Sequence, residues 1–525
     1  MTQTDEGVRP SRAETVLVGD RPLSIEEVVA VARHDAPVQV SEAAWERVRA
    51  ARTIVEDLAD DTIAHYGVST GFGALATTHI PLEKRTRLQR SLVRSHAAGM
   101  GEPVEREVVR ALMLLRIQTL ATGHTGIREE TLRLYLALLE HDITPVVHEY
   151  GSLGCSGDLA PLAHCAMALL GEGQVLLGEE PMPAAQALET VGLTPVVLHE
   201  KEGLALINGT DGMLGMLCLA IHDLQVQLTT ADIACAMSVE GLLGSDDVFA
   251  ADLQALRPHT GQAESAANLR AVLADSPIRE SHRDPAACTR VQDAYSLRCA
   301  PSVHGAARDT LAHARRVAET ELASAVDNPV ITDDGRVESN GNFHGAPVAY
   351  VLDFLAIVAA DVASMSERRT DRFLDVARNH GLPPFLADDP GTDSGLMIAQ
   401  YTAAGIVSEM KRLAAPASVD SIPSSAMQED HVSMGWAGGR KLRRAVDGLT
   451  RVLTVELVAA SRGLALRAPL QPSPTSAAVI RELDALASTA PGPDRDLGAD
   501  LGACYLTVHD GGPVLAAQSV TGPLH

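Results

Sequence analysis

Apolar residues recur along this chain mainly at spacings of three and four, which is the repeat of an α-helix. One series runs from Val303 to Ala325 with steps of 4, 4, 3, 4, 4 and 3, and another runs from Val446 to Leu464 with steps of 3, 4, 4, 3 and 4. A third apolar run extends from Val104 to Leu120. Because these stripes are rich in alanine and leucine, they predict a mainly α fold, a bundle of long helices packed side by side. The best of the few strand patterns is Val330 to Val337, in which Asp334-Gly335 predicts a hairpin turn.

Polar residues mark the starts of two predicted helices near the N-terminus. Ser24 and Glu27 have the spacing of a capping box, which predicts a short helix, and Ser41 predicts the start of another helix that runs toward Leu58. The preceding residues are polar and acidic and lack the apolar run of a signal peptide. We therefore expect residues 1–20 to form a flexible N-terminal tail.

The remainder, residues 21–525, is expected to form a single large helical domain. No linker rich in proline, glycine or serine divides it, and no internal repeat is evident. Its most apolar segment, Ala349 to Met365, is interrupted by Asp353 and Asp361. These two charges favour a buried helix over a membrane span.

Composition and charge exclude several classes of function. Hydrophobic residues make up 46% of the chain and charged residues 21%, as in an ordinary globular protein with a large core. The formal net charge of −25 argues against nucleic acid or an anionic membrane as a partner. Seven cysteines without a Cys-x-x-Cys pair fit a reducing compartment and predict a cytoplasmic protein. No metal-binding spacing such as His-Glu-x-x-His occurs, so nothing in the sequence requires a metal ion.

The most informative stretch runs from His148 to His164, with Cys155-Ser156-Gly157 at its centre. Gly154 and Gly157 allow backbone conformations that a Cβ atom would forbid. A helix is expected to start at Asp158, the predicted N-cap. The triplet would then lie at the positive end of a helix dipole, which suits an electron-poor group or an anion.

Three interpretations of this triplet differ in chemistry. The simplest is a tight turn before a helix. A serine-hydrolase elbow would require Gly-x-Ser-x-Gly, but Asp158 occupies the place of the last glycine. The third is cyclisation, in which the amide nitrogen of Gly157 attacks the carbonyl of Cys155, two waters leave and Ser156 becomes a methylidene. The product is 4-methylidene-imidazole-5-one (MIO).

Several motifs spread over nearly the whole chain, from about Ser24 onward, select the third interpretation. The chain resembles the MIO-dependent aromatic amino acid ammonia-lyase and aminomutase family at Tyr66-Gly-Val-Ser-Thr-Gly-Phe-Gly73, Ser95-His-Ala-Ala-Gly99, Gly203-Leu-Ala-Leu-Ile-Asn-Gly-Thr210, Gln292-Asp-Ala-Tyr-Ser-Leu-Arg298, Asp327-Asn-Pro329, Gly341-Asn-Phe-His-Gly345 and Gln428-Glu-Asp-His-Val-Ser-Met434. The family's triplet usually begins with alanine where this chain has Cys155. Because the first residue gives only its carbonyl to the ring, we expect cyclisation to survive.

The resemblance implies elimination of ammonia from an α-amino acid. The methylidene from Ser156 would supply the electrophile for nitrogen, and Tyr66 would be the base for the β-hydrogen, which requires a lowered pKa of its phenol. Asn208 would donate a hydrogen bond to the ring, and Tyr295 would order its environment. The other residues that match pocket positions of the family are Gln292, Arg298, Asn328 and Phe343. Among these, Arg298 would bind the substrate carboxylate, because a guanidinium matches its two oxygens.

Two residues match the members of the family that use histidine. Glu429 can accept a hydrogen bond from an imidazole N–H, and His96 can exchange one with the other ring nitrogen. The expected reaction is therefore conversion of L-histidine to urocanate. Met410 and Met427 stand where many histidine-using members have asparagine, and members that use tyrosine also carry a histidine at the position of His96.

Other interpretations remain open at this point. The same residues would serve a tyrosine ammonia-lyase or an MIO-dependent aminomutase, and a non-catalytic protein on this scaffold would be expected to have lost Ser156, Gly157 or Tyr66. Gly71-x-Gly73-x-x-Ala76 mimics a dinucleotide fingerprint, but no alternation of strands and helices surrounds it. His304, His344 and His431 are expected to be structural. Members of the family are homotetramers with shared active sites, which the resemblance implies here.

Overall fold

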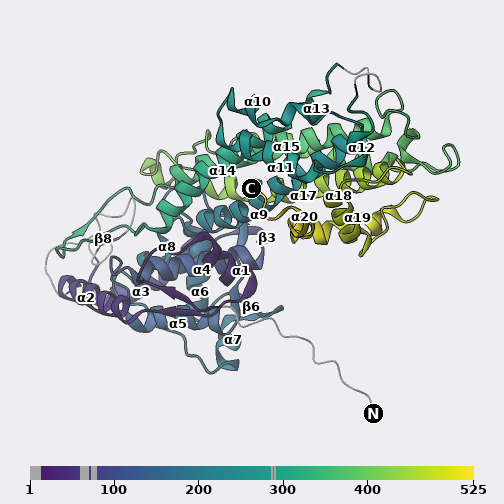
Figure 1. The fold of residues 1–525 in the computed structure, drawn as a ribbon. Coiled ribbons are helices and arrows are strands. Elements are labelled where there is room, and N and C mark those ends of the chain that lie inside the picture. The colour runs from purple at the N-terminus through teal and green to yellow at the C-terminus, as the bar shows by residue number, and fades with distance from the viewer. Residues whose placement is uncertain (1–13, 60–69, 72–79, 285–287, 289–290) are drawn as a thin grey trace, which may run out of the picture. The chain divides into compact units, whose positions relative to one another are not determined.

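The computed structural model of this 525-residue chain describes residues 14–59, 70–71, 80–284, 288 and 291–525, and it is mainly helical with few short strands (Figure 1). This confirms the predicted fold class. Contacts group the chain into two compact units, the first comprising Met1–Leu219, Arg315–Leu352 and Ala417–Arg440 and the second comprising Ala220–Ala314, Asp353–Pro416 and Lys441–His525. Four of the five boundaries between the units fall inside long helices, and the fifth, between Pro416 and Ala417, falls between helices. The single domain expected for residues 21–525 stays a prediction.

The first unit combines helices with short strands. Its elements are β1 (Val16–Val18), α1 (Ile25–His34), β2 (Val38–Val40), α2 (Glu42–Ala59), α3 (Leu82–His96), β3 (Met100–Pro103), α4 (Arg106–Ala121), α5 (Glu129–Glu140), β4 (Ile143–Pro145), β5 (His148–Tyr150), α6 (Leu159–Leu169), β6 (Gln174–Leu177), β7 (Glu180–Pro183), α7 (Ala184–Thr190), α8 (Glu202–Ile207), β8 (Val330–Ile331), β9 (Val337–Glu338) and the 3₁₀ turn η4 (Ser425–Met427).

The elements described in the second unit are all helical. They are η2 (Asp247–Phe249), α10 (Ala251–Ala255), α11 (Thr260–Leu273), α12 (Pro277–Glu280), α13 (Tyr295–Arg298), η3 (Pro384–Leu386), α16 (Met397–Leu413), α18 (Pro474–Asp484), α19 (Leu497–His509) and α20 (Gly512–Thr521). Four long helices hold residues of both units: α9 (Asp211–Gly241), α14 (Ala300–Leu322), α15 (Ala346–Leu374) and α17 (Gly435–Ala465).

The predicted helix starts are confirmed. The capping box at α1 is complete, because the backbone N–H of Glu27 donates to Ser24 Oγ at 3.1 Å and that of Ser24 donates to Glu27 Oε2 at 2.8 Å. Ser41 Oγ likewise accepts from the N–H of Ala44 at the start of α2. The tail predicted for residues 1–20 is too long, however. Val16–Val18 forms β1, whose buried valines pair it in parallel with Val38–Val40.

The long apolar stripes lie on helices as predicted. The stripe that begins at Val303 lies on α14, although this helix ends at Leu322 and leaves Ala325 outside, and the stripe that begins at Val446 lies on α17. The predicted hairpin is present as the antiparallel pair β8–β9, with Gly335 at φ +82° in its turn. Glycine adopts this left-handed conformation without a steric penalty.

The core of the first unit is built around α4. Every residue of α4 from Val108 to Ala121 is buried, and α1 and α5 pack against this helix. Next to it, α6 packs against α3 and α8. The strands form small sheets: β1–β2 is parallel, and β3–β5, β4–β6–β7 and β8–β9 are antiparallel. The stretch from His148 to His164 thus begins in β5, which pairs with β3, and ends in α6, which packs against α3 and α8.

In the second unit, buried polar groups tie the long helices to one another. Asp232 on α9 accepts hydrogen bonds from His304 and Arg308 on α14, at 2.8 and 2.7 Å. Glu456 on α17 pairs with Arg369 on α15 and also accepts a hydrogen bond from Ser238 on α9. These bonds confirm the prediction that the long helices pack side by side. They also give His304 the structural role expected of it.

Helix α15 contains the apolar segment that begins at Ala349. It is the one helix among the described residues that is long and apolar enough to cross a membrane, and 61% of its most apolar window is buried inside the protein. A buried core helix passes the same test of length and composition. The burial agrees with the prediction of a buried helix.

Candidate active site

The loop between β5 and α6 presents the predicted triplet. Gly157 has φ +76° and forms an isolated parallel bridge with Gly209, and the next residue, Asp158, donates its N–H to the carbonyl of Gly209 at 2.7 Å. A Cβ atom on Gly157 would lie 1.9 Å from that carbonyl oxygen. Gly154 has φ +73°, and a Cβ atom there would lie 2.1 Å from Ser433 Oγ. The tertiary structure therefore requires glycine at both positions, which leaves the amide of residue 157 uncovered by any side chain of its own.

Asp158 is the N-cap of α6, as predicted, but its side chain makes no hydrogen bond to that helix. Its carboxylate instead accepts from the N–H of Met213 at 2.8 Å and from Ser152 Oγ at 3.0 Å. Burial raises the pKa of Asp158 to about 7, against the opposing effect of these hydrogen bonds. The carboxylate thus binds the loop to the first turn of α9 instead of capping α6.

Ser156 and Cys155 are half-buried on this loop. The carboxylate of Glu429 lies near enough to the Cys155 thiol to act on it electrostatically. Burial first, and this carboxylate second, raise the pKa of Cys155 to about 12. The thiol is therefore protonated at neutral pH.

Asn208 and Asn328 are brought together beside the loop. Asn208 is the C-cap of α8 and is buried, and its Nδ2 donates to the carbonyl of Asn328 at 3.0 Å. Asn328 Oδ1 accepts from Ser339 Oγ at 3.1 Å and from the N–H of Asn340 at 3.0 Å. Because Gly209 follows Asn208 directly, the same segment contacts both Gly157 and Asn328.

Sequence reasoning missed the buried charges that hold this segment. Arg116 on α4 donates to the carbonyl of Asn208 and, at 3.0 Å, to that of Val326. Lys201 and Asp327 form an ion pair of 2.6 Å that is fully buried. The available signal was the position of Arg116 between the apolar residues Leu115 and Ile117, since a charge is rarely buried without partners.

The remaining pocket candidates of the first unit lie on separate elements. His96 is the last residue of α3, and its Nδ1 donates to the carbonyl of Leu92 at 2.8 Å, because a carbonyl can only accept. Phe343 is half-buried just before α15. Its neighbour His344 lies 3.3 Å from His431, nitrogen to nitrogen, which fits the structural role expected of both histidines. The pairing of His96 with Glu429 around a substrate stays a prediction.

Gln292, Tyr295 and Arg298 belong to the second unit. Tyr295 is 70% exposed on α13, and the guanidinium of Arg298 stacks 4.6 Å from the centre of its ring. Arg298 Nε donates to the carbonyl of Asp293 at 2.9 Å, and Gln292 is exposed. Gln292 and Tyr295 are thus exposed, and the half-buried Arg298 lies against Tyr295. Tyr66, the predicted base, lies outside the described residues.

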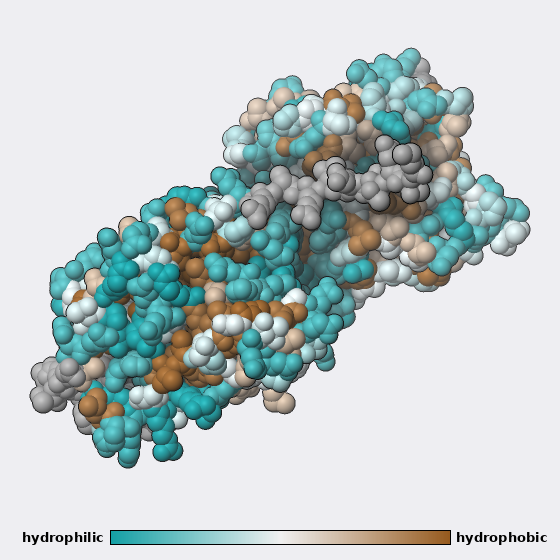
Figure 2. Space-filling view, turned by 90° about the horizontal axis from the view of Figure 1, so that it is seen from below, coloured by the Kyte–Doolittle hydropathy of each residue, from teal (hydrophilic) through white to brown (hydrophobic). Residues whose placement is uncertain are grey.

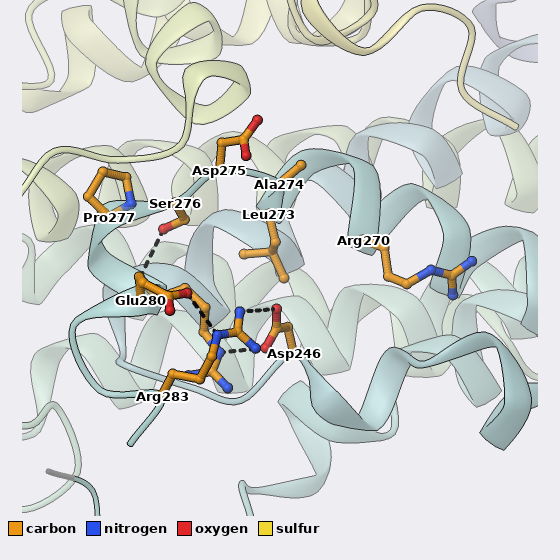
Figure 3. Close-up of a pocket in the computed structure, with 10 residues that line it drawn as sticks. Asp246, Arg270, Leu273, Ala274, Asp275, Ser276, Pro277, Glu280 and Arg283 are labelled. Carbon is orange, nitrogen blue, oxygen red and sulfur yellow. Dashed lines mark hydrogen bonds and ion pairs between the residues drawn. The ribbon is translucent and has the colours of Figure 1, made fainter. Parts of the chain in front are cut away.

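A pocket of about 630 Å³ in the second unit contains none of the predicted residues (Figure 3). Four of its charged side chains pair with one another: Arg283 pairs with Asp246 at 3.1 Å and with Glu280 at 2.8 Å, and Arg279 pairs with Asp246 at 2.6 Å. Within the described ranges, no group of three or more histidine, cysteine, aspartate or glutamate residues could hold a metal ion. The loop at residues 155–157 is therefore the best candidate for a reactive site.

Comparison with known proteins gives a consistent result. Residues 23–485 match the aromatic amino acid lyase family. The chain is 62% identical to histidine ammonia-lyase of Streptomyces avermitilis, over 97% of this chain and 99% of that protein. Among solved structures, tyrosine aminomutase of Streptomyces globisporus matches with a TM-score of 0.91 at 36% identity, covering 97% of this chain and 100% of that one. Histidine ammonia-lyase of Trypanosoma cruzi matches with a TM-score of 0.88 at 35% identity, covering 96% and 95%.

Proposed function

Because this chain belongs to the aromatic amino acid lyase family, we propose that it is a carbon–nitrogen lyase that converts L-histidine to urocanate and ammonia. The histidine ammonia-lyase of Streptomyces avermitilis is 62% identical to this chain, and the match covers 99% of that protein. The residues that distinguish substrates within this chain, His96 and Glu429, suit an imidazole. The function is thus the first step in breaking down histidine.

The family uses MIO, and we propose that Cys155-Ser156-Gly157 forms it in this chain. The observation that carries this proposal is the conformation of Gly157, which has φ +76° and no room for a Cβ atom against Gly209. Glycine at this position leaves the amide nitrogen without a Cβ atom beside it, which lowers the steric hindrance to its attack on the Cys155 carbonyl, two residues back. The half-buried Ser156 supplies the hydroxyl that is lost as water.

In the proposed mechanism the ring would supply an electrophile for the substrate nitrogen. Side chains of the protein remove the proton and bind the substrate. Tyr66 removes the β-hydrogen as a phenolate. Arg298 binds the substrate carboxylate through two parallel hydrogen bonds. Asn208 donates a hydrogen bond where negative charge develops, and Glu429 accepts one from the imidazole. The resemblance further assigns to the substrate site Gln292, Tyr295, Asn328 and Phe343.

The test of the function is a product assay. Purified protein incubated with L-histidine should release urocanate and ammonia in equal amounts, whereas Ser156→Ala should release neither. Ammonia release without an unsaturated acid would contradict elimination. A β-amino acid as the main product would establish an aminomutase instead.

We further propose that the chain assembles into a homotetramer with shared active sites in the cytoplasm. Large apolar side chains lie exposed at helical spacing on two helices of the second unit: Phe354 and Ile357 on α15, and Ile398 and Tyr401 on α16. Figure 2 shows apolar residues gathered in clusters on one face of the molecule. Exposed apolar clusters commonly mark surfaces that another protein covers, and the exposed Tyr295 supports a site completed by a second copy. Light scattering should therefore give four chains of 55.3 kDa per particle.

A further inference from the structure

Arg116 is a buried charge that the packing of α4 does not explain by itself. Its side chain has no exposed area, and the carboxylate of Asp211 lies 3.5 Å from its Nη1. Replacing buried charges by well-packed apolar side chains is often neutral or stabilising, because burying a charge has a large desolvation cost. The stability of the fold therefore does not account for an arginine at this position.

The guanidinium of Arg116 joins two main-chain segments that carry the candidate asparagines. Its Nη1 donates to the carbonyl of Asn208, and its Nη2 donates at 3.0 Å to the carbonyl of Val326, two residues before Asn328. Because a guanidinium is planar and rigid, it holds these two carbonyls at a fixed separation. The side chain of Asn208 completes the link by donating from Nδ2 to the carbonyl of Asn328 at 3.0 Å.

This link determines where the rest of the Asn208 amide points. A side-chain amide has two N–H donors on one nitrogen, so donation of one to the Asn328 carbonyl orients the other. Gly209 follows directly and lies close to the same guanidinium, since a Cβ atom there would be 2.7 Å from Arg116 Nη1. Gly209 also forms the bridge with Gly157. The arginine thus supports the segment that lies beside the ring-forming loop.

We propose that Arg116 is a positioning residue for Asn208: by holding the carbonyls of Asn208 and Val326 together, it directs the second N–H of the Asn208 amide toward the ring. This inference rests on the proposed function, in which Asn208 donates to the ring as negative charge develops. Arg116 thereby contributes to the rate of the reaction without touching the substrate.

The experiment compares Arg116→Met, which removes both donors, with Arg116→Lys, which keeps the charge on a single nitrogen. Arg116→Met should lower kcat for L-histidine by about 10- to 10²-fold, less than the loss typical for removing a transition-state donor itself. KM should stay within about threefold, because the contact acts on charge that develops during the reaction. Arg116→Lys should recover part of this loss and remain about threefold or more below the wild type. Both variants should keep the loss of two waters in their mass.

Arg52→Met is the matched control, because it removes the same kind of contact elsewhere in the first unit. Arg52 is buried, and its Nη1 donates to the carbonyls of Glu200 at 3.0 Å and Gly126 at 3.4 Å. Both methionine variants should lose thermal stability, but Arg52→Met should leave kcat within about twofold.

Hydrogen exchange gives a readout that depends on neither the ring nor turnover. In Ser156→Ala, which cannot form the ring, adding Arg116→Met should speed exchange of the Asp158 N–H by about threefold or more. This N–H donates to the carbonyl of Gly209, in the segment that Arg116 holds. Adding Arg52→Met should leave this exchange unchanged.

An Asn208→Ala background tests whether the arginine acts through the asparagine. Arg116→Met should add little to the fall in kcat caused by Asn208→Ala, because interacting residues are not additive. Wild-type kcat in either Arg116 variant, absence of the mass deficit, an equal fall in Arg52→Met, or a full additional fall in Asn208→Ala would each overturn the role of Arg116. A wild type that does not convert histidine at all would instead overturn the proposed function.

Discussion

Gly157 occupies a position in this protein that only glycine fits. Its left-handed backbone conformation and its contact with the Gly209 carbonyl exclude every residue with a Cβ atom. The same contact keeps the loop close to Asn208, the residue expected to donate to the ring. Cyclisation and tertiary packing therefore both favour glycine at position 157.

The first prediction concerns the mass of the mature protein. Ring formation removes two waters, so the wild type should be lighter than its sequence mass by about 36 Da. Ser156→Ala should have its full sequence mass and no activity, because the hydroxyl that leaves as water is gone. Ser519→Ala, an exposed position on α20, is the matched control and should keep the mass deficit. An active enzyme with its full sequence mass would exclude MIO.

The second prediction concerns the base. Tyr66→Phe should keep the mass deficit and lose about 10²- to 10⁴-fold in kcat, which is the usual contribution of a general base. Tyr505→Phe serves as the control, since that hydroxyl donates to Asp447 at 2.7 Å far along the chain, and it should leave kcat within twofold. A loss of less than tenfold in Tyr66→Phe would assign the base to another residue.

At the scale of elements, the site depends on segments that are distant in sequence. The loop after β5 is held by the first turn of α9 through Asp158, and by the segment before α17 through Leu153 and Gly154. Asn208 at the end of α8 is held by Arg116 of α4. Buried charges with several partners perform this anchoring, so the elements can meet in one arrangement only.

A buried ion pair between α15 and α17 gives the third prediction. Arg369 and Glu456 are fully buried and bonded through two contacts of 2.5 and 2.8 Å. Glu456→Gln should lower the free energy of unfolding by about 3–5 kcal/mol, because it leaves the Arg369 charge buried without its counter-ion. Thermal unfolding of the variant measures the loss.

Two controls accompany this measurement. Solvent screens the exposed pair of Arg336 and Glu338, so Glu338→Gln should unfold nearly as the wild type does. Replacing Arg369 and Glu456 together by methionine should recover much of the stability lost in Glu456→Gln. A double variant as unstable as the single one would show that the helices need the ion pair itself.

For the whole molecule, the fourth prediction is a preference among substrates. Measured kcat/KM should be highest for L-histidine, with L-tyrosine and L-phenylalanine about 10²- to 10⁴-fold lower. A phenyl ring would leave the polar groups of His96 and Glu429 unpaired, at a cost of roughly 1–3 kcal/mol each. Glu429→Gln should reduce this preference while the mass deficit remains. Equal use of tyrosine would assign a different substrate and leave the lyase mechanism intact.

The local features of this protein could be predicted from its residues alone. Helices α1, α2, α4, α14 and α17 follow from apolar spacing and from capping residues, because both signals act within a few residues of one another. The β8–β9 hairpin follows from Asp334-Gly335 for the same reason. The Cys155-Ser156-Gly157 triplet and the motifs that resemble the family could also be recognised in the sequence, because the proposed reaction depends on residue type.

Contacts between residues that are far apart in the sequence became apparent only in the tertiary structure. The contact of Gly157 with Gly209, the bond from Asn208 to Asn328 and the bond from Ser433 to Gly154 join residues that lie tens to hundreds of positions apart. The buried partners of Arg116 and the pairing of β1 with β2 escaped prediction for the same reason. Such contacts depend on how elements pack in three dimensions, and the spacing of residues along the chain carries no signal of that packing.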